Sequence, residues 1–108
     1  MTMPLQFQSC RPVTGGAAMT AGEWQPLLAQ LTGWTVAADV LEKRFSFPDF
    51  QRTMAFVNGV AEIANAQDHH PDMRVSYGRC TLRWSTHSVG GLSINDFICA
   101  ARVDAMPA

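Results

Sequence analysis

The sequence lacks several features that mark specialised classes of protein. No apolar run approaches the ~20 residues of a membrane-spanning helix, and no basic stretch followed by an apolar core stands at the N-terminus. Charge is also sparse, since 16% of the residues are charged and the formal net charge is -1. Nucleic-acid binding calls for a clearly basic face. We therefore expect a soluble, cytoplasmic protein without direct nucleic-acid or membrane binding.

Cysteine is scarce too, and its spacing is uninformative. Cys10, Cys80 and Cys99 are far apart and odd in number, which matches neither a disulfide framework nor a CxxC metal site. Reduced thiols are the simpler interpretation. Cys80 and Cys99 have apolar neighbours and are expected to act as small core side chains.

The chain length allows one folded domain. A chain of 108 residues with 47% hydrophobic residues suits a single globular core. The first residues mix Pro, Gly, Gln and Ser without periodicity. We expect a flexible N-terminal tail over residues 1–19 and a domain over residues 20–108.

Hydrophobic periodicity predicts three helices. The first begins at the capping box of Thr20 and Glu23 and is expected to continue until Gly33. The second follows Asp49 and carries apolar residues on so many sides that it should be nearly buried. The third follows Ser93, which has capping-box spacing to Asp96.

Alternation of apolar and polar residues predicts four strands, in two hairpins before and after the second helix. They fall at about residues 34–36, 41–47, 73–77 and 80–85. The order α-β-β-α-β-β-α predicts an α+β fold, in which helices pack on one face of a four-stranded antiparallel sheet.

All three histidines of the chain fall where regular structure breaks. His69 and His70 precede Pro71, which ends a helix and disfavours helical geometry at His70, and His87 closes a strand. Loop positions of this kind often carry function. Unpaired imidazoles donate or accept protons near neutrality, so general acid/base chemistry is the simplest use of the set.

Other interpretations of the histidines remain open on spacing alone. Three histidines form the ligand set of some zinc centres, but adjacent His69 and His70 rarely chelate one ion together. A catalytic histidine paired with a nucleophilic side chain is a still less favoured interpretation, since no serine lies in a nucleophile-elbow motif. In the plainest interpretation His69 and His70 cap a helix end and His87 finishes a strand.

A longer motif adds a family resemblance. The string EIANAQDHHP at residues 62–71, then Tyr77, Thr86-His87 and GLSIND at residues 91–96, resembles the signature of the pterin-4a-carbinolamine dehydratases, bacterial type. Order and gaps both match, and the likeness covers about residues 24–104. Each element alone is weak, so the specificity lies in the shared spacing.

The resemblance implies an activity and its setting. The family removes water from 4a-hydroxytetrahydropterin to give quinonoid dihydropterin, in tetrahydrobiopterin recycling for aromatic amino-acid hydroxylation. The pterin would be the substrate, with no separate cofactor and no metal. A homodimer or homotetramer, formed through sheet edges or helices, and a functional link to phenylalanine hydroxylase are implied as well.

The resemblance also implies the site. His69 and His87 would form the proton-transfer pair and His70 would orient the substrate, although the sequence leaves open which imidazole is the acid. The residues expected around the pterin, including the second choices Asp68 and Ser85, are His69, His70, Pro71, Thr86, His87, Ser88, Val89, Asp96, Asp68 and Ser85.

One site position departs from the family pattern. Asn65 stands four residues before His69, where the family usually carries an ionisable side chain. Asn can hydrogen-bond a ring but cannot carry a charge. The alternative function is a catalytically weak binding module, acting as a dimerisation or regulatory partner of another protein, because animal members of the family also stabilise the dimer of a homeodomain transcription factor. Asn65 favours this alternative slightly, and a thiol or metal sensor is a third.

Overall fold

The computed structural model describes residues 3–13 and 15–107 and has the predicted order of elements. Two short 3-10 helices, η1 and η2, accompany three α-helices and four strands. Their bounds are η1 Leu5–Phe7, α1 Ala21–Leu28, β1 Thr35–Ala37, β2 Val40–Ser46, α2 Phe50–Gln67, β3 Asp72–Ser76, β4 Arg79–Trp84, η2 His87–Val89 and α3 Ile94–Asp104.

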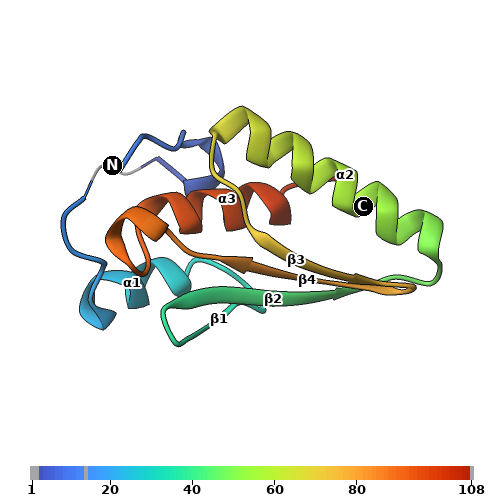
Figure 1. The fold of residues 1–108 in the computed structure, drawn as a ribbon, viewed down its shortest axis with the longest axis horizontal. Helices are drawn as coiled ribbons and strands as arrows, with labels where there is room; N and C mark the ends of the chain where they lie inside the picture. The colour runs from blue at the N-terminus through green and yellow to red at the C-terminus, as the bar shows by residue number, and fades with distance from the viewer. Residues whose placement is uncertain (1–2, 14, 108) are drawn as a thin grey trace.

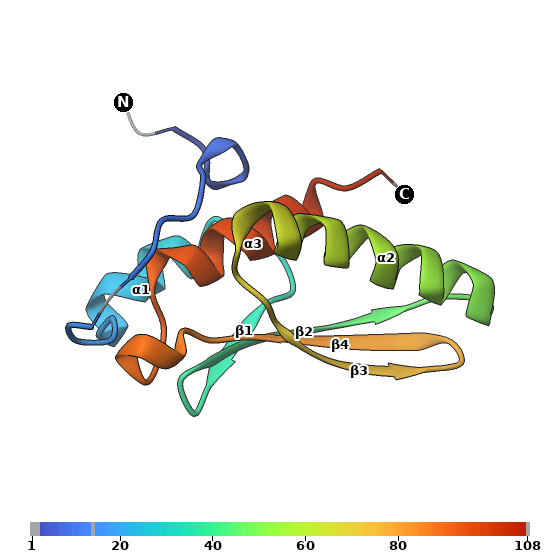
Figure 2. The ribbon, with the colours of Figure 1, turned by 45° about the horizontal axis from the view of Figure 1, so that its top comes forward.

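The four strands form one antiparallel sheet in the order β1-β2-β4-β3. The helices α2 and α3 lie on one face of this sheet, and α1 lies beside α3 at one end (Figures 1 and 2). The predicted fold class is confirmed. No helix within residues 3–13 or 15–107 combines the length and apolar composition needed to cross a membrane.

Side-chain caps start the helices where the sequence predicts. Thr20 with Glu23 and Ser93 with Asp96 both form capping boxes, and the Asp49 carboxylate accepts from the backbone N–H of Arg52 at 2.8 Å. The end of α1 differs from the prediction, because the helix stops at Leu28 rather than near Gly33. Beyond Leu28 the backbone tightens into turns closed by bonds to the carbonyl three residues back.

The core lies between the inner strands and α3. Leu41 of β2, Leu82 and Trp84 of β4 and Phe97 of α3 are all fully buried. The prediction that α2 is nearly buried is wrong: its buried residues are only Thr53, Val60 and Ala64. Since α2 packs on a single sheet face, its far side stays open to solvent.

The 3-10 helix η1 of the N-terminal segment packs against α3 (Figure 1). Leu5 is buried in the core cluster, and the Arg102 guanidinium donates through Nε to the Gln8 carbonyl at 3.0 Å. Farther along, the Met19 backbone N–H donates to the Leu92 carbonyl at 2.9 Å. Residues 1–19 thus include anchored parts, and the mobility of the tail stays a prediction.

Candidate active site

The end of α2 sets the direction of the first two histidines. Asp68 adopts a left-handed conformation with φ of 51°, and the His69 backbone N–H reaches back to the Ala64 carbonyl at 3.1 Å. This bond closes the helix in the manner of a Schellman motif. An Asp tolerates the left-handed region better than most residues. The chain therefore turns sharply at Asp68, and Pro71 prevents the helix from resuming.

This turn directs His69 inward, onto Asp96 at the start of α3. The His69 Nε2 lies 2.6 Å from the Asp96 Oδ1, and the two side chains are 13% and 0% exposed. An ionised carboxylate only accepts hydrogen bonds, so Nε2 must carry the proton. The other ring nitrogen, Nδ1, is then the one that can exchange a proton with a bound molecule.

The Asp96 carboxylate is held from its other side by two further donors. The Thr86 hydroxyl donates to Oδ2 at 2.8 Å, and the Ser93 backbone N–H donates to the same oxygen at 3.0 Å. The Ser93 contact belongs to the capping box of α3. One carboxylate therefore starts a helix and orients a histidine, so its position is fixed before any ligand binds.

These contacts raise the pKa of His69. Burial lowers the pKa of this imidazole, but the hydrogen bond to Asp96 and the charge of Asp96 outweigh it, with smaller contributions from the charges of Cys10 and Asp68. The net direction is upward from the ordinary value. The charged form of His69 is therefore favoured, as a group that must donate a proton near neutrality requires.

Trp84 forms the wall behind His69. The two rings are stacked, with centroids 5.7 Å apart and planes within 14°. Trp84 is the last residue of β4 and is fully buried. An aromatic face beside an imidazole favours the cationic form through its quadrupole. Trp84 was absent from the predicted site, and its place at a strand end was the available signal.

His70 lies apart from this cluster. Its side chain is exposed, and its Nε2 lies 3.3 Å from the Asn65 Oδ1 one turn back on α2. His70, which was predicted to orient the substrate, thus contacts Asn65, the position where the sequence departs from the family pattern. A carboxylate at position 65 would offer His70 a charged partner, whereas Asn offers a neutral one.

His87 does not extend β4, because that strand ends at Trp84 and His87 begins η2. The loop that carries η2 is closed by Thr86 and Gly91, whose backbone N–H and carbonyl bond at 2.7 Å. Thr86 faces inward to Asp96, while His87 and Ser88 are exposed. His87 thus adjoins the Asp96 cluster through its neighbour in the chain.

The predicted site residues therefore fall into two sets. Hydrogen bonds join His69, Asp96 and Thr86 directly, with Ser93 as a partner that was predicted only as a helix cap. The remaining positions are exposed or half-buried around this cluster: Asn65, Asp68, His70, Pro71, Ser85, His87, Ser88 and Val89. Their assignment to a pterin stays a prediction.

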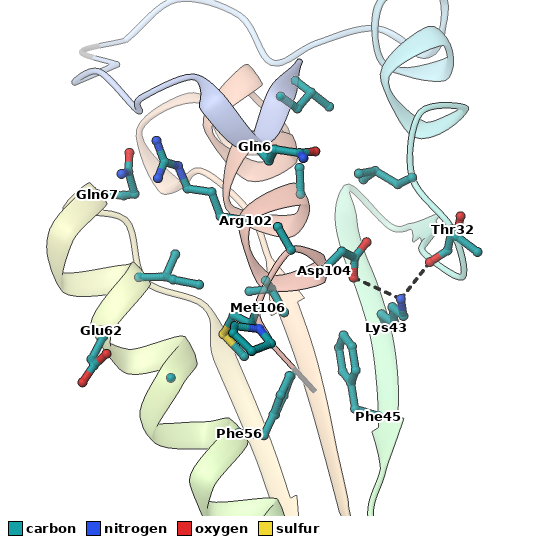
Figure 3. A pocket seen from close by; sticks show the side chains of 18 of the residues that line it. Gln6, Thr32, Lys43, Phe45, Phe56, Glu62, Gln67, Arg102, Asp104 and Met106 are labelled. Carbon is teal, nitrogen blue, oxygen red and sulfur yellow. Dashed lines mark hydrogen bonds and ion pairs between the residues drawn. The ribbon is translucent and has the colours of Figure 1, made fainter. Parts of the chain in front are cut away.

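A separate groove of about 1280 Å³ lies between α2, α3 and β2, and none of the predicted site residues lines it. At one end of the groove Lys43 donates to the Thr32 carbonyl at 2.8 Å and to the Asp104 carboxylate at 3.1 Å, and its Nζ lies over the ring of Phe45 (Figure 3). Among the described residues, no cluster of three or more His, Cys, Asp or Glu could hold a metal ion.

The comparisons with known proteins identify the family. The model of the Pterin 4 alpha carbinolamine dehydratase family matches residues 17–106. The chain belongs to this family. A relative from Nitrosospira multiformis, provisionally named a pterin-4-alpha-carbinolamine dehydratase, is 44% identical over 94% of this chain and 91% of its own length. A relative from Nitrosomonas eutropha with the same provisional name is 46% identical over 94% and 92%.

Solved structures agree on the dehydratase fold. A transcriptional coactivator/pterin dehydratase from Brucella melitensis has a TM-score of 0.78 and 29% identity, covering 82% of this chain and 96% of its own. A pterin dehydratase-like protein described as a RuBisCO assembly factor in the alpha-carboxysome has a TM-score of 0.56 and 23% identity, covering 67% and 83%. The second likeness shows the fold alone.

Proposed function

We propose that this member of the family dehydrates 4a-hydroxytetrahydropterin to quinonoid dihydropterin and water. The observation that supports this proposal best is the His69–Asp96 pair, in which a buried carboxylate raises the pKa of a histidine and so favours its protonated form at the HHP motif. The reaction needs one proton delivered to the departing 4a-hydroxyl and one removed from N5. No electron transfer and no covalent intermediate are required.

His69 is the acid in this mechanism. With Nε2–H bound to Asp96, the imidazolium delivers its Nδ1 proton to the 4a-hydroxyl, which leaves as water. Asp96 stabilises the positive charge beforehand and keeps the ring in one orientation. Thr86 and Ser93 act as positioning residues, since they touch the carboxylate and not the imidazole.

His87 is the base and His70 the orienting donor. His87 is exposed in η2 and accepts the N5 proton, so acid and base are different histidines. His70, beside Asn65, donates to the polar edge of the pterin. Because Asn65 is uncharged, it supports this contact less strongly than a carboxylate would.

The proposed biological setting is recycling of tetrahydrobiopterin or a related tetrahydropterin. The product would be reduced back to the cofactor of an aromatic amino-acid hydroxylase, with phenylalanine hydroxylase as the expected functional partner. The pterin is the substrate in this scheme, and the chemistry needs no further cofactor. Histidines supply both proton transfers.

A binding module is the second candidate function. The edge strand β3 is exposed along its whole length, and Met73, Val75 and Tyr77 are 37%, 40% and 68% exposed. An exposed edge with apolar side chains favours pairing with another chain, so a homodimer or homotetramer is proposed. The Brucella protein is named a transcriptional coactivator as well as a pterin dehydratase, which supports a partner role in a relative.

The dehydratase is tested by following the decay of freshly formed 4a-hydroxytetrahydropterin in a stopped-flow spectrometer. Wild type should accelerate the decay, and His69→Ala or His87→Ala should each reduce this acceleration by ~10²-fold or more. Arg52→Ala is the control, because Arg52 is exposed in the first turn of α2, about 25 Å along the helix from His69.

The pH dependence of the acceleration tests the role of His69 as the acid. Because the pKa of His69 is raised, acceleration should fall only as pH rises past that raised value. Asn65→Glu should increase the rate if His70 orients the substrate. Well-folded wild-type protein that leaves the decay unchanged would exclude the dehydratase and favour the binding module.

A further inference from the structure

Two of the three cysteines meet although the sequence keeps them far apart. The sulfur of Cys10 lies 3.5 Å from the sulfur of Cys99, across a separation of 89 residues. Cys99 is fully buried in the middle of α3, whereas Cys10 is half-buried in the N-terminal segment, outside regular structure. Cys80, the third cysteine, is fully buried in β4.

The approach of Cys10 is fixed by contacts on both sides of it. The Cys10 backbone N–H donates to the Gln67 Oε1 at 2.7 Å. The next residue, Arg11, exchanges two bonds with the Asn95 side chain, at 3.1 Å for its N–H and 2.7 Å for its carbonyl. These bonds attach the segment to the end of α2 and to α3. The fold itself therefore places the two thiols next to each other.

The surroundings make the two thiols unequal. The hydrogen bond from the Cys99 thiol lowers the pKa of Cys10, against a rise from burial, and the positive charges of His69 and Arg102 lower it further. The same hydrogen bond and burial raise the pKa of Cys99 far above its ordinary value. Cys10 therefore has the character of an attacking thiolate, and Cys99 that of a protonated partner.

We propose that Cys10 and Cys99 are a site of reversible oxidation, at which a hydroperoxide converts the thiol pair into a disulfide that ties the N-terminal segment to α3. The Cys10 thiolate attacks the peroxide oxygen, the O–O bond breaks, and the leaving alkoxide or hydroxide takes a proton from solvent. Cys10 becomes a sulfenic acid. The Cys99 sulfur then attacks the Cys10 sulfur, and its proton leaves with the hydroxide as water.

The geometry suits this bond without rearrangement of the core. A disulfide needs about 2.05 Å between sulfurs, so the pair must close by about 1.5 Å. Cys99 is held by the helix, so the movement falls on Cys10, whose segment is tied by bonds to the Gln67 and Asn95 side chains and not by helix or sheet pairing. The peroxide reaches Cys10 first, because this sulfur is the less buried of the two.

The test follows a tryptic fragment that contains Cys10. Trypsin does not cut the Arg11–Pro12 bond, so its first cut follows Lys43 and releases residues 1–43, in which Cys10 is the one cysteine. Cys80 falls in the fragment 80–83 and Cys99 in the fragment 84–102. After treatment of the folded protein with dilute hydrogen peroxide, tryptic digestion and mass spectrometry without reductant should find fragment 1–43 joined to 84–102, with loss of two hydrogens. Dithiothreitol should release it.

Three variants control the result. Cys10→Ser should abolish the linked fragment, and Cys99→Ser should leave Cys10 to oxidise further to sulfinic acid, since no neighbouring thiol resolves the sulfenic acid. Cys80→Ala should leave the link intact, and circular dichroism checks that each variant is folded. A link from Cys10 to Cys80, a link between two molecules, or unchanged thiols in folded wild type would each overturn the proposal.

Discussion

Replacing Asp96 with Asn changes one oxygen of a fully buried carboxylate to an amide and removes its charge. Three donors lose an ionised acceptor: the His69 imidazole at 2.6 Å, the Thr86 hydroxyl at 2.8 Å and the Ser93 N–H at 3.0 Å. Breaking a buried ion pair costs about 3–5 kcal/mol. Since the amide oxygen still accepts one bond and His69 can become neutral, we expect Asp96→Asn to lower the free energy of unfolding by about 3 kcal/mol.

The same substitution should reverse the sign of the pKa shift at His69. In wild type, burial lowers this pKa and Asp96 more than compensates, so the pKa lies above its ordinary value. Without the Asp96 charge, burial becomes the dominant effect and the pKa of His69 should fall below its ordinary value. A nuclear magnetic resonance titration of the imidazole C–H protons measures both values, with His70→Ala and His87→Ala assigning the signals.

The reversal also predicts how the stability difference depends on pH. In wild type, His69 contributes stability that is fully present below the unfolded pKa of about 6.5 and is lost as pH rises through the raised folded value. In Asp96→Asn, protonation of His69 instead opposes folding at low pH. The difference between the two proteins should thus be largest below pH ~6.5 and should shrink above the raised pKa.

Asp68→Asn is the matched control, because Asp68 makes the smallest contribution to the raised pKa of His69 and Asn tolerates its left-handed backbone. In this control, we expect the pKa of His69 to stay above its ordinary value and stability to change by less than about 1 kcal/mol. Urea unfolding followed by circular dichroism measures both proteins. If Asp96→Asn left the pKa of His69 raised, the assignment of Asp96 as its cause would be wrong.

Further substitutions test the supports of the site and of the hairpin. Thr86→Val removes the hydroxyl that binds Asp96 and should cost about 1–3 kcal/mol in urea unfolding, whereas Thr86→Ser, which keeps the hydroxyl, should cost less. Equal losses in both variants would refute the role of that bond. Gly78→Ala places a Cβ 2.8 Å from the Phe47 carbonyl oxygen and should destabilise the turn by about 1–3 kcal/mol. Gly22→Ala meets nothing closer than 3.9 Å in α1 and should be neutral or stabilising by up to about 1 kcal/mol in thermal unfolding.

Local chemistry explains what the sequence predicts well. The capping boxes at Thr20 and Ser93 and the alternation in β2 and β4 depend on residues close together in the chain, and all of them are found in the structure. The order of these elements then suffices for the fold class. The predicted end of α1 is less accurate. The apolar residues keep their helical spacing past Leu28, although the backbone there tightens into turns.

Contacts between distant segments are what the sequence leaves open. Asp96 was predicted to support the site through family resemblance, but its bond to His69 spans 27 residues and no local pattern encodes it. The Cys10–Cys99 contact is more remote still, and wide cysteine spacing argues against pairing when only the sequence is considered. The strand pattern ran past Trp84 to His87 for a different, local reason, because the Thr86–Gly91 bond closes a short loop that apolar alternation does not reveal.

The shared use of Asp96 couples stability to the proposed chemistry. Its carboxylate completes the capping box of α3 and also holds the His69 proton, so one substitution affects both folding and proton transfer. A loss of activity in Asp96→Asn would therefore be ambiguous by itself. Thr86→Val resolves the ambiguity, because it loosens the carboxylate without removing its charge. If charge on Asp96 supports catalysis, Thr86→Val should lose stability while His69 keeps a raised pKa and the reaction keeps its alkaline limit.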